Sequence, residues 1–194
     1  QLQDATLIIV SLLFVVIHVQ HMAAGNWSSA PFAIENSVLV FLFLTRRKSR
    51  ATSTRPSDWV FATVGGWGPL AFQLHGGTAG WLDGPGFALQ MVGLSFAAVC
   101  FTGLGRSFGV VAANRGLKTS GPYRVVRHPI YACHLLTDIG FLMVNPFWFN
   151  FVLFSFTSTA QIMRIRAEER VLTESGDYAN YKTQVRYRLI PGIY

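Results

Sequence analysis

The stretch Arg115-Gly-Leu-Lys-Thr-Ser-Gly-Pro-Tyr-Arg-Val-Val-Arg-His-Pro-Ile-Tyr131 is polar, basic and rich in rings, although long apolar segments flank it on both sides. Gly121-Pro122 predicts a turn, and Pro129 predicts the first position of a helix, where a missing N–H costs nothing. Membrane topology alone would explain the lysine and arginine side chains, but it does not explain the clustered tyrosine and histidine residues. We therefore interpret the stretch as a functional loop around which the rest of the chain is organised.

Composition places the chain among membrane proteins. Of its 194 residues, 51% are hydrophobic and 13% are charged, which is far fewer charged residues than a soluble domain carries. All 16 lysine and arginine residues fall within the segments 46–55, 106–127 and 164–188. This clustering is typical of cytoplasmic loops, so the net charge of +7 indicates topology and contact with membrane lipids, and no nucleic acid partner is expected.

Apolar segments follow one another along the chain at 5–22, 31–45, 59–74, 86–105, 130–144 and 146–163. We predict an all-α integral membrane protein with a bundle of five to six transmembrane helices. Asn145-Pro146 separates the last two segments, which predicts a tight helical hairpin whose second helix continues beyond the membrane surface towards Gly176. Gly65-Gly66 in the third segment is expected to allow a neighbouring helix to approach closely.

The linkers 23–30 and 76–85 contain no lysine or arginine, so they are predicted to face the outside. The basic segments and both termini are then predicted to face the cytoplasm. The expected location is the cell inner membrane, with the site on its cytoplasmic side. The tail 177–194 is amphipathic and carries several tyrosine and arginine residues. It is predicted to lie at the membrane interface as a helix.

Ionisable residues in apolar surroundings are the candidates for chemistry. Arg164 and Glu168 are four residues apart and share a helix face. Two interpretations stay open: an ion pair that supports the helix end, or an arginine that binds a substrate carboxylate beside a glutamate that faces a cationic or hydroxyl-rich ligand. His134 and Asp138 leave the same choice between a mutually satisfied pair and a functional one. The histidine and cysteine spacings fit no metal site, so no metal is expected.

Further motifs follow the loop along the chain. Thr119-Ser-Gly-Pro-Tyr-Arg-Val-Val-Arg-His-Pro-Ile-Tyr131, then Arg164-x-x-x-Glu168-Glu169, Gly176-Asp-Tyr-x-x-Tyr181 and Pro191, resemble the isoprenylcysteine carboxyl methyltransferase family and its phospholipid methyltransferase relatives. The resemblance covers about 112–191, and the first 105 residues match as generic spans. It implies S-adenosylmethionine-dependent methylation of the carboxylate of a lipophilic acceptor, such as a C-terminal S-isoprenylcysteine that enters from the bilayer. N-methylation of a phospholipid amine or another small lipophilic acceptor is the alternative.

The same resemblance implies roles for individual residues. Arg164 would bind the acceptor carboxylate and Glu168 would contact the cofactor, and both are the predicted catalytic residues. The residues predicted to bind S-adenosylmethionine are Arg115, Gly116, Leu117, Lys118, Tyr123, His128, Pro129, Ile130, Tyr131 and Glu168. Residues 1–105 would anchor the protein through four spans, and residues 106–194 would form the catalytic, cofactor-binding subdomain.

The chemistry of this donor agrees with the composition of the loop. A sulfonium and an ammonium need aromatic faces and oxygens, and a carboxylate needs basic groups. An acceptor carboxylate is already ionised at neutral pH and needs no general base, so catalysis reduces to alignment and exclusion of water. We therefore expect a cofactor pocket under the 106–128 loop and a lateral gap between helices that opens to the cytoplasmic leaflet.

Overall fold

The computed structural model describes residues 2–25, 30–49, 51–73, 80–174 and 176–194. In chain order its elements are α1 Leu2–Ala23, α2 Ala30–Thr45, β1 Ala51–Thr52, α3 Pro56–Trp67, the 3-10 helix η2 Gly68–Ala71, α4 Asp83–Leu104, η3 Gly105–Ser107, β2 Ala113–Asn114, η4 Gly121–Arg124, α5 Pro129–Val144, α6 Trp148–Thr173 and α7 Asp177–Gln184. The prediction of an all-α protein is confirmed, and a helix occupies each predicted apolar segment. The linkers 23–30 and 76–85 lie partly outside the described residues.

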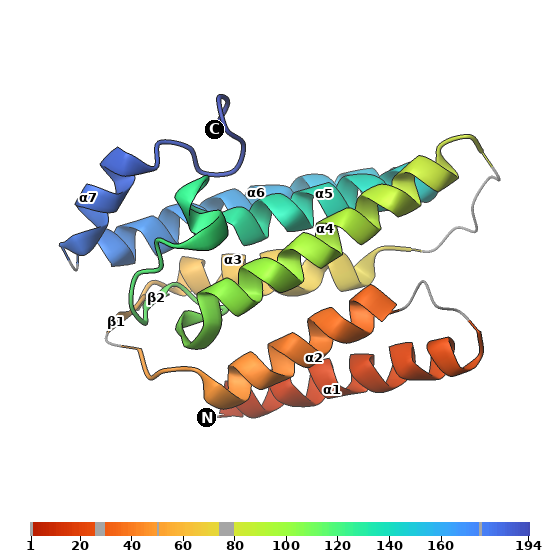
Figure 1. Cartoon of the computed structure of the whole chain (residues 1–194), viewed down its shortest axis with the longest axis horizontal. Coiled ribbons are helices and arrows are strands. Elements are labelled where there is room, and N and C mark those ends of the chain that lie inside the picture. Colours follow the sequence, from red (N-terminus) through yellow and green to blue (C-terminus); the bar gives the residue numbers. More distant parts are fainter. Residues whose placement is uncertain (1, 26–29, 50, 74–79, 175) are drawn as a thin grey trace.

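The functional loop lies at one end of the helical bundle (Figure 1). α1 and α2 form a hairpin along one side, and α3 to α6 make up the rest. β1 and β2, which pair Ala51 with Asn114, gather at the same end as η4 and α7, and both chain ends lie there too. The basic segments of the sequence therefore come together at one end, as the topology prediction requires.

Membrane character is clearest in α4. Among the described residues, Asp83–Ser107 is the one segment long and apolar enough to cross a bilayer, with a mean hydropathy of 1.8. Shorter apolar helices cover Ile8–Ala23, Phe32–Thr45 and Pro129–Val144. Large apolar side chains such as Phe41, Leu44 and Phe156 are more than half exposed, as lipid-facing residues would be. The number of spans stays a prediction.

Glycine residues let α4 and α5 pack in direct backbone contact. A Cβ at Gly86 would lie 2.8 Å from the carbonyl oxygen of Gly140, and a Cβ at Gly140 would lie 2.6 Å from the carbonyl oxygen of Gly86. Further along, a Cβ at Gly93 would lie 2.9 Å from the carbonyl oxygen of Cys133. No side chain fits at these points, so the small residues hold the two helices closer than ordinary packing allows.

The turn between α5 and α6 is fixed by a fully buried asparagine, Asn150. Its Nδ2 donates hydrogen bonds to the carbonyl oxygens of Asn145, at 3.1 Å, and of Gln73, at 3.0 Å, and its Oδ1 accepts one from the backbone N–H of Gln73 at 2.9 Å. The turn is thereby tied to the segment that follows η2. This arrangement confirms the tight hairpin predicted from Asn145-Pro146.

The tail is packed more tightly than its amphipathic sequence suggested. Tyr178, Tyr181 and Val185 form a buried cluster against Leu117 and Leu172. Two of the tyrosines expected at the membrane interface are therefore core residues, because α7 buries its aromatic face against the loop and α6 rather than leaving it for lipid. The position of α7 relative to a bilayer stays a prediction.

Candidate active site

Tyr131, on the first turn of α5, brings the two predicted catalytic residues of α6 together. Its hydroxyl donates a hydrogen bond to Glu168. The guanidinium carbon of Arg164 lies over its ring, 5.1 Å from the centroid, which is a cation–π contact. Within the described chain Arg164 and Glu168 form no ion pair with each other, so that interpretation of their spacing was wrong. Each side chain contacts Tyr131 instead.

Arg164 is held in place by the backbone and by a small residue on α3. Its Nη2 donates to the carbonyl oxygen of Val110 at 3.0 Å. A Cβ at Gly65 would lie 3.0 Å from the Cδ of Arg164 and 3.4 Å from the Cγ of Gln161. The predicted close approach at Gly65-Gly66 is thus confirmed, and the space it leaves is filled by the arginine. The Nε of Arg164 is buried and has no hydrogen-bond partner among the described residues.

His128 lies just before α5, between the two adjacent carboxylates of α6. Its Nδ1 is 3.7 Å from Glu168 Oε2, and its Nε2 is 3.3 Å from Glu169 Oε1. Pro129 occupies the first position of α5, as predicted, and fixes the entry of the chain into that helix. The structure therefore brings His128, Tyr131, Arg164 and Glu168 into one site at the end of the bundle.

Glu169 follows Glu168 in the sequence motif, but the motif predicts no role for it. It is 7% exposed, and it faces Arg127 Nε at 3.0 Å and Arg188 Nη2 at 2.8 Å as well as His128. Burial alone would raise the pKa of this carboxyl, but hydrogen bonds from His128 and Arg188 and the charge of Arg127 outweigh it and lower the pKa. The backbone before α5 is also hydrogen-bonded to the tail. The N–H of Arg127 donates to the carbonyl oxygen of Tyr187, and the N–H of His128 donates to that of Arg188, both at 2.9 Å.

This environment predicts an acid-dependent loss of stability. The folded-state pKa of Glu169 lies below its unfolded value, so its contribution is complete above about pH 4.3 and is lost as the pH falls towards the folded pKa. We expect the free energy of unfolding of the natural chain to fall by up to about 1.4 kcal/mol per pH unit more steeply below pH 4.3 than that of Glu169→Gln. Chemical denaturation of both proteins between pH 3 and 6 measures this difference, and parallel profiles would contradict it.

Other residues predicted to bind the cofactor have packing roles in the structure. Tyr123 donates from its buried hydroxyl to the carbonyl oxygen of Cys100 at 3.4 Å, and its own carbonyl accepts from Tyr181 at 2.6 Å. Burial raises the pKa of Tyr181 to about 12, so this donor stays protonated. Ile130 packs against the core cluster between α2 and α4, and Leu117 packs against the tail. Their contacts with a cofactor remain predictions.

The start of the predicted cofactor loop is shaped by its backbone. Gly116 has a φ of +101°, which side chains rarely adopt, and its N–H donates to Asn114 Oδ1 at 3.0 Å. The carbonyl of Arg115 accepts from Ser107 at 3.2 Å. Arg115 and Lys118 are half-buried beside it. The loop is therefore a defined structure that presents basic side chains.

Two further candidate ionisable residues lie inside the bundle. His134 lies against Phe101, with ring centroids 6.0 Å apart, and Asp138 has a buried Oδ2 without a hydrogen-bond partner among the described residues. The mutually satisfied pair considered for them is therefore not formed. Within the described part of the chain, no three histidine, cysteine, aspartate or glutamate residues are arranged to hold a metal ion.

The described residues form a helical protein in which α4 is apolar enough to cross a membrane and a polar site lies where apolar helices meet a basic loop. Residues 87–174, from α4 to the end of α6, match the model of the isoprenylcysteine carboxyl methyltransferase (ICMT) family. The recognition of this family from the sequence motifs is thus confirmed by a match over this segment, which contains all four residues that converge on the site. A search of curated proteins found no match.

Proposed function

We propose that the protein transfers a methyl group from S-adenosylmethionine to the carboxylate of a lipophilic acceptor, such as a C-terminal S-isoprenylcysteine. One observation supports this most directly. The Nε of Arg164 is buried without a hydrogen-bond partner in the described part of the chain. Arg164 lies over the Tyr131 ring, which contacts Glu168, inside the segment that matches the family. A guanidinium in such surroundings suits a carboxylate, which it can bind through two parallel hydrogen bonds.

The residues around this point fit S-adenosylmethionine by their chemistry. When bound, the cofactor would supply an electrophilic methyl group on a positively charged sulfur. Glu168 and the rings of His128 and Tyr131 would hold its cationic parts, and Arg115 and Lys118 would attract its carboxylate. The backbone around Gly116 would line the pocket. The assignment of Leu117, Tyr123, Pro129 and Ile130 to the cofactor follows from the family resemblance and is part of this proposal.

The protein's own contribution to the reaction is positioning. A carboxylate acceptor needs no base at neutral pH, so Arg164 would bind and orient it. The buried surroundings of Tyr131 would exclude water, which strengthens these electrostatic contacts. An amine acceptor would need a group that takes a proton, and the adjacent His128 and Glu168 are placed to do so. N-methylation of a phospholipid amine is therefore the second candidate function.

The membrane arrangement belongs to the same proposal. In this arrangement five to six spans would cross the cell inner membrane, and the loop end and both termini would face the cytoplasm. A water-soluble donor and a lipid-borne acceptor would then meet at the loop end. Residues 1–105 would anchor the protein, and 106–194 would carry catalysis. The gathering of the basic segments at one end supports this orientation.

The proposal is tested with the purified full chain. Calorimetry with S-adenosylhomocysteine should show binding, and thermal stability should rise with its concentration. Methyl transfer from labelled donor to a farnesylcysteine analogue and to phosphatidylethanolamine then separates the two candidate reactions. Absence of any affinity for the donor and for its demethylated product would reject both.

A matched pair of glycine substitutions tests the placement of Arg164. Gly65→Ala would press on the Arg164 side chain, whereas a Cβ at Gly66 would meet it at an ordinary 3.7 Å. We expect Gly65→Ala to lower methyl transfer about tenfold, because misplacing a reacting group by a fraction of an ångström is costly, and Gly66→Ala to change it less than twofold. Both variants gain the same helix propensity, so equal rates in the two would show that Gly65 does not position the arginine.

A further inference from the structure

A groove of about 310 Å³ lies between α2 and the end of α4. Its lining residues are Ser37, Val38, Phe41, Leu42, Thr102 and Gly105. The hydroxyl groups of Ser37 and Thr102 donate to carbonyl oxygens of their own helices, at 2.7 Å and 2.8 Å. The polar side chains of the lining are thus already satisfied, and the groove presents an apolar surface.

The groove is separated from the candidate active site. Leu42, which lines it, belongs to a buried cluster with Phe43, Phe101 and Phe108. The ring centroids of Phe43 and Phe101 each lie 5.2 Å from that of Phe108, and Ile130 of α5 packs against the same cluster. This aromatic wall stands between the groove and α5. The groove is therefore separated by this cluster from the start of α5, which carries Tyr131 of the candidate site.

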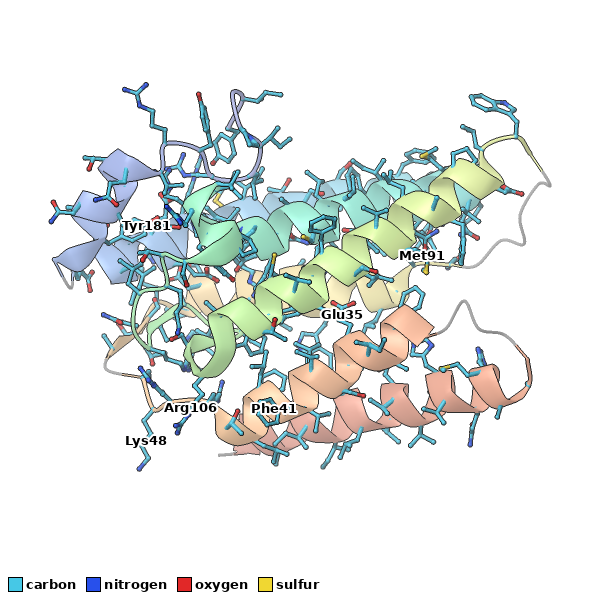
Figure 2. All side chains as sticks on the ribbon, viewed as in Figure 1. Glu35, Phe41, Lys48, Met91, Arg106 and Tyr181 are labelled. Atoms are coloured by element: carbon cyan, nitrogen blue, oxygen red, sulfur yellow. The ribbon has the colours of Figure 1, made fainter. Side chains whose placement is uncertain are left out.

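Basic side chains lie where the groove ends. Gly105 is followed by Arg106, whose Nε donates to the carbonyl oxygen of Thr45 and whose carbonyl accepts from the N–H of Arg47, both at 2.8 Å. Arg47, Lys48 and Arg106 are exposed, and no acidic residue of the described chain forms an ion pair with them. Figure 2 shows Lys48 and Arg106 at the same end of the molecule as Phe41.

We propose that this groove binds an anionic phospholipid, with an acyl chain in the groove and the phosphate against Arg47, Lys48 and Arg106. A neutral lipid would leave the basic residues without a partner, and a soluble anion would leave the apolar groove unfilled. One amphiphile with a negative head satisfies both parts. Its head would lie beside the predicted cofactor loop, because Arg47 Nη1 lies 3.8 Å from the position of a Cβ at Gly116.

Native mass spectrometry of the purified full chain tests this proposal. Phosphatidylglycerol and phosphatidylcholine with identical acyl chains serve as probes, without donor or acceptor, so the result does not depend on the proposed reaction. We expect phosphatidylglycerol to bind at least tenfold more tightly. Arg47→Gln and Lys48→Gln should each weaken its binding about fivefold, which corresponds to ~1 kcal/mol per basic residue, and leave phosphatidylcholine unchanged.

Two controls locate the site. Lys182→Gln removes one exposed charge from α7 and should leave the affinity for phosphatidylglycerol unchanged, whereas Thr102→Leu should fill the groove and weaken binding of both lipids. Ser37→Leu replaces Thr102→Leu if that variant does not fold. The proposal would be overturned if both lipids bound equally well, or if Lys182→Gln and Lys48→Gln had equal effects. Full binding of lipid to the variant with the filled groove would also overturn it. So would displacement of phosphatidylglycerol by a farnesylcysteine analogue, which would make the groove the acceptor entrance.

Discussion

Arg164→Ala is expected to lower methyl transfer to a carboxylate acceptor by about 100- to 1,000-fold and to leave the affinity for S-adenosylhomocysteine nearly unchanged. The guanidinium is the basic group that lies over Tyr131 beside Glu168, and removing a preorganised charge partner from a water-poor site costs about this much. Rates with labelled donor and calorimetry of the product complex measure the two quantities separately. Arg164→Lys keeps the charge but loses the planar guanidinium that can donate two parallel hydrogen bonds, so we expect it to recover little activity.

The opposite pattern is expected for two other residues of the site, His128 and Glu168. His128→Ala and Glu168→Ala are expected to weaken binding of the cofactor product, because these groups are proposed to hold its cationic parts. If all three substitutions weaken product binding to the same extent, the proposed division between acceptor and cofactor residues is wrong. If Arg164→Ala loses transfer to phosphatidylethanolamine as well as to the carboxylate, the arginine does not select the acceptor.

Glu169→Ala is expected to have the largest effect on stability. Its removal would leave Arg127 buried without a carboxylate partner among the described residues and His128 with Glu168 alone. Breaking a buried ion pair from one side typically costs about 3–5 kcal/mol. The same change releases Arg188, so trypsin should cleave the tail at that residue faster. Denaturant titration and limited proteolysis of the natural and variant chains give both results.

Glu174→Ala, at the C-cap residue that follows α6, is the matched control for this substitution. Glu174 is exposed at the end of α6, so its replacement should change the free energy of unfolding by less than about 0.5 kcal/mol. Arg188→Ala should fall between the two, because its side chain is 27% exposed and water can replace part of the lost contact. Similar stability in the Glu169 and Glu174 variants would mean that the buried carboxylate does not hold the tail.

Much of the fold could be predicted because apolar runs and breaks in a chain of this composition are easy to recognise. The helical hairpin follows from Asn145-Pro146, and the close packing of α3 follows from Gly65-Gly66. The environment of the tail was harder to predict, because a helix on a lipid surface and a helix packed on a protein surface have the same amphipathic pattern. The pairing of β1 with β2 escaped notice, since two residues per strand leave no alternating pattern.

Most residues of the site could be predicted from the sequence, but the contacts between their side chains could not. Spacing placed Arg164 and Glu168 on one face, but it could not show that Tyr131 comes between them. Glu169 was visible as part of a motif, yet its partners come from a loop 41 residues away and from a tail 19 residues away. Such contacts depend on the tertiary fold, and one sequence carries no direct signal for them.

The asparagine clamp at the far end of the bundle has a mechanical consequence for the site. α5 contributes Tyr131, α6 contributes Arg164 and Glu168, and the two helices are joined at the turn that Asn150 fixes. α5 has 16 residues, which makes a lever of about 24 Å, so a rotation of about 2° at this hinge would move its opposite end by about 1 Å. By fixing this turn, Asn150 therefore limits small rotations that would be magnified where the reacting groups must align.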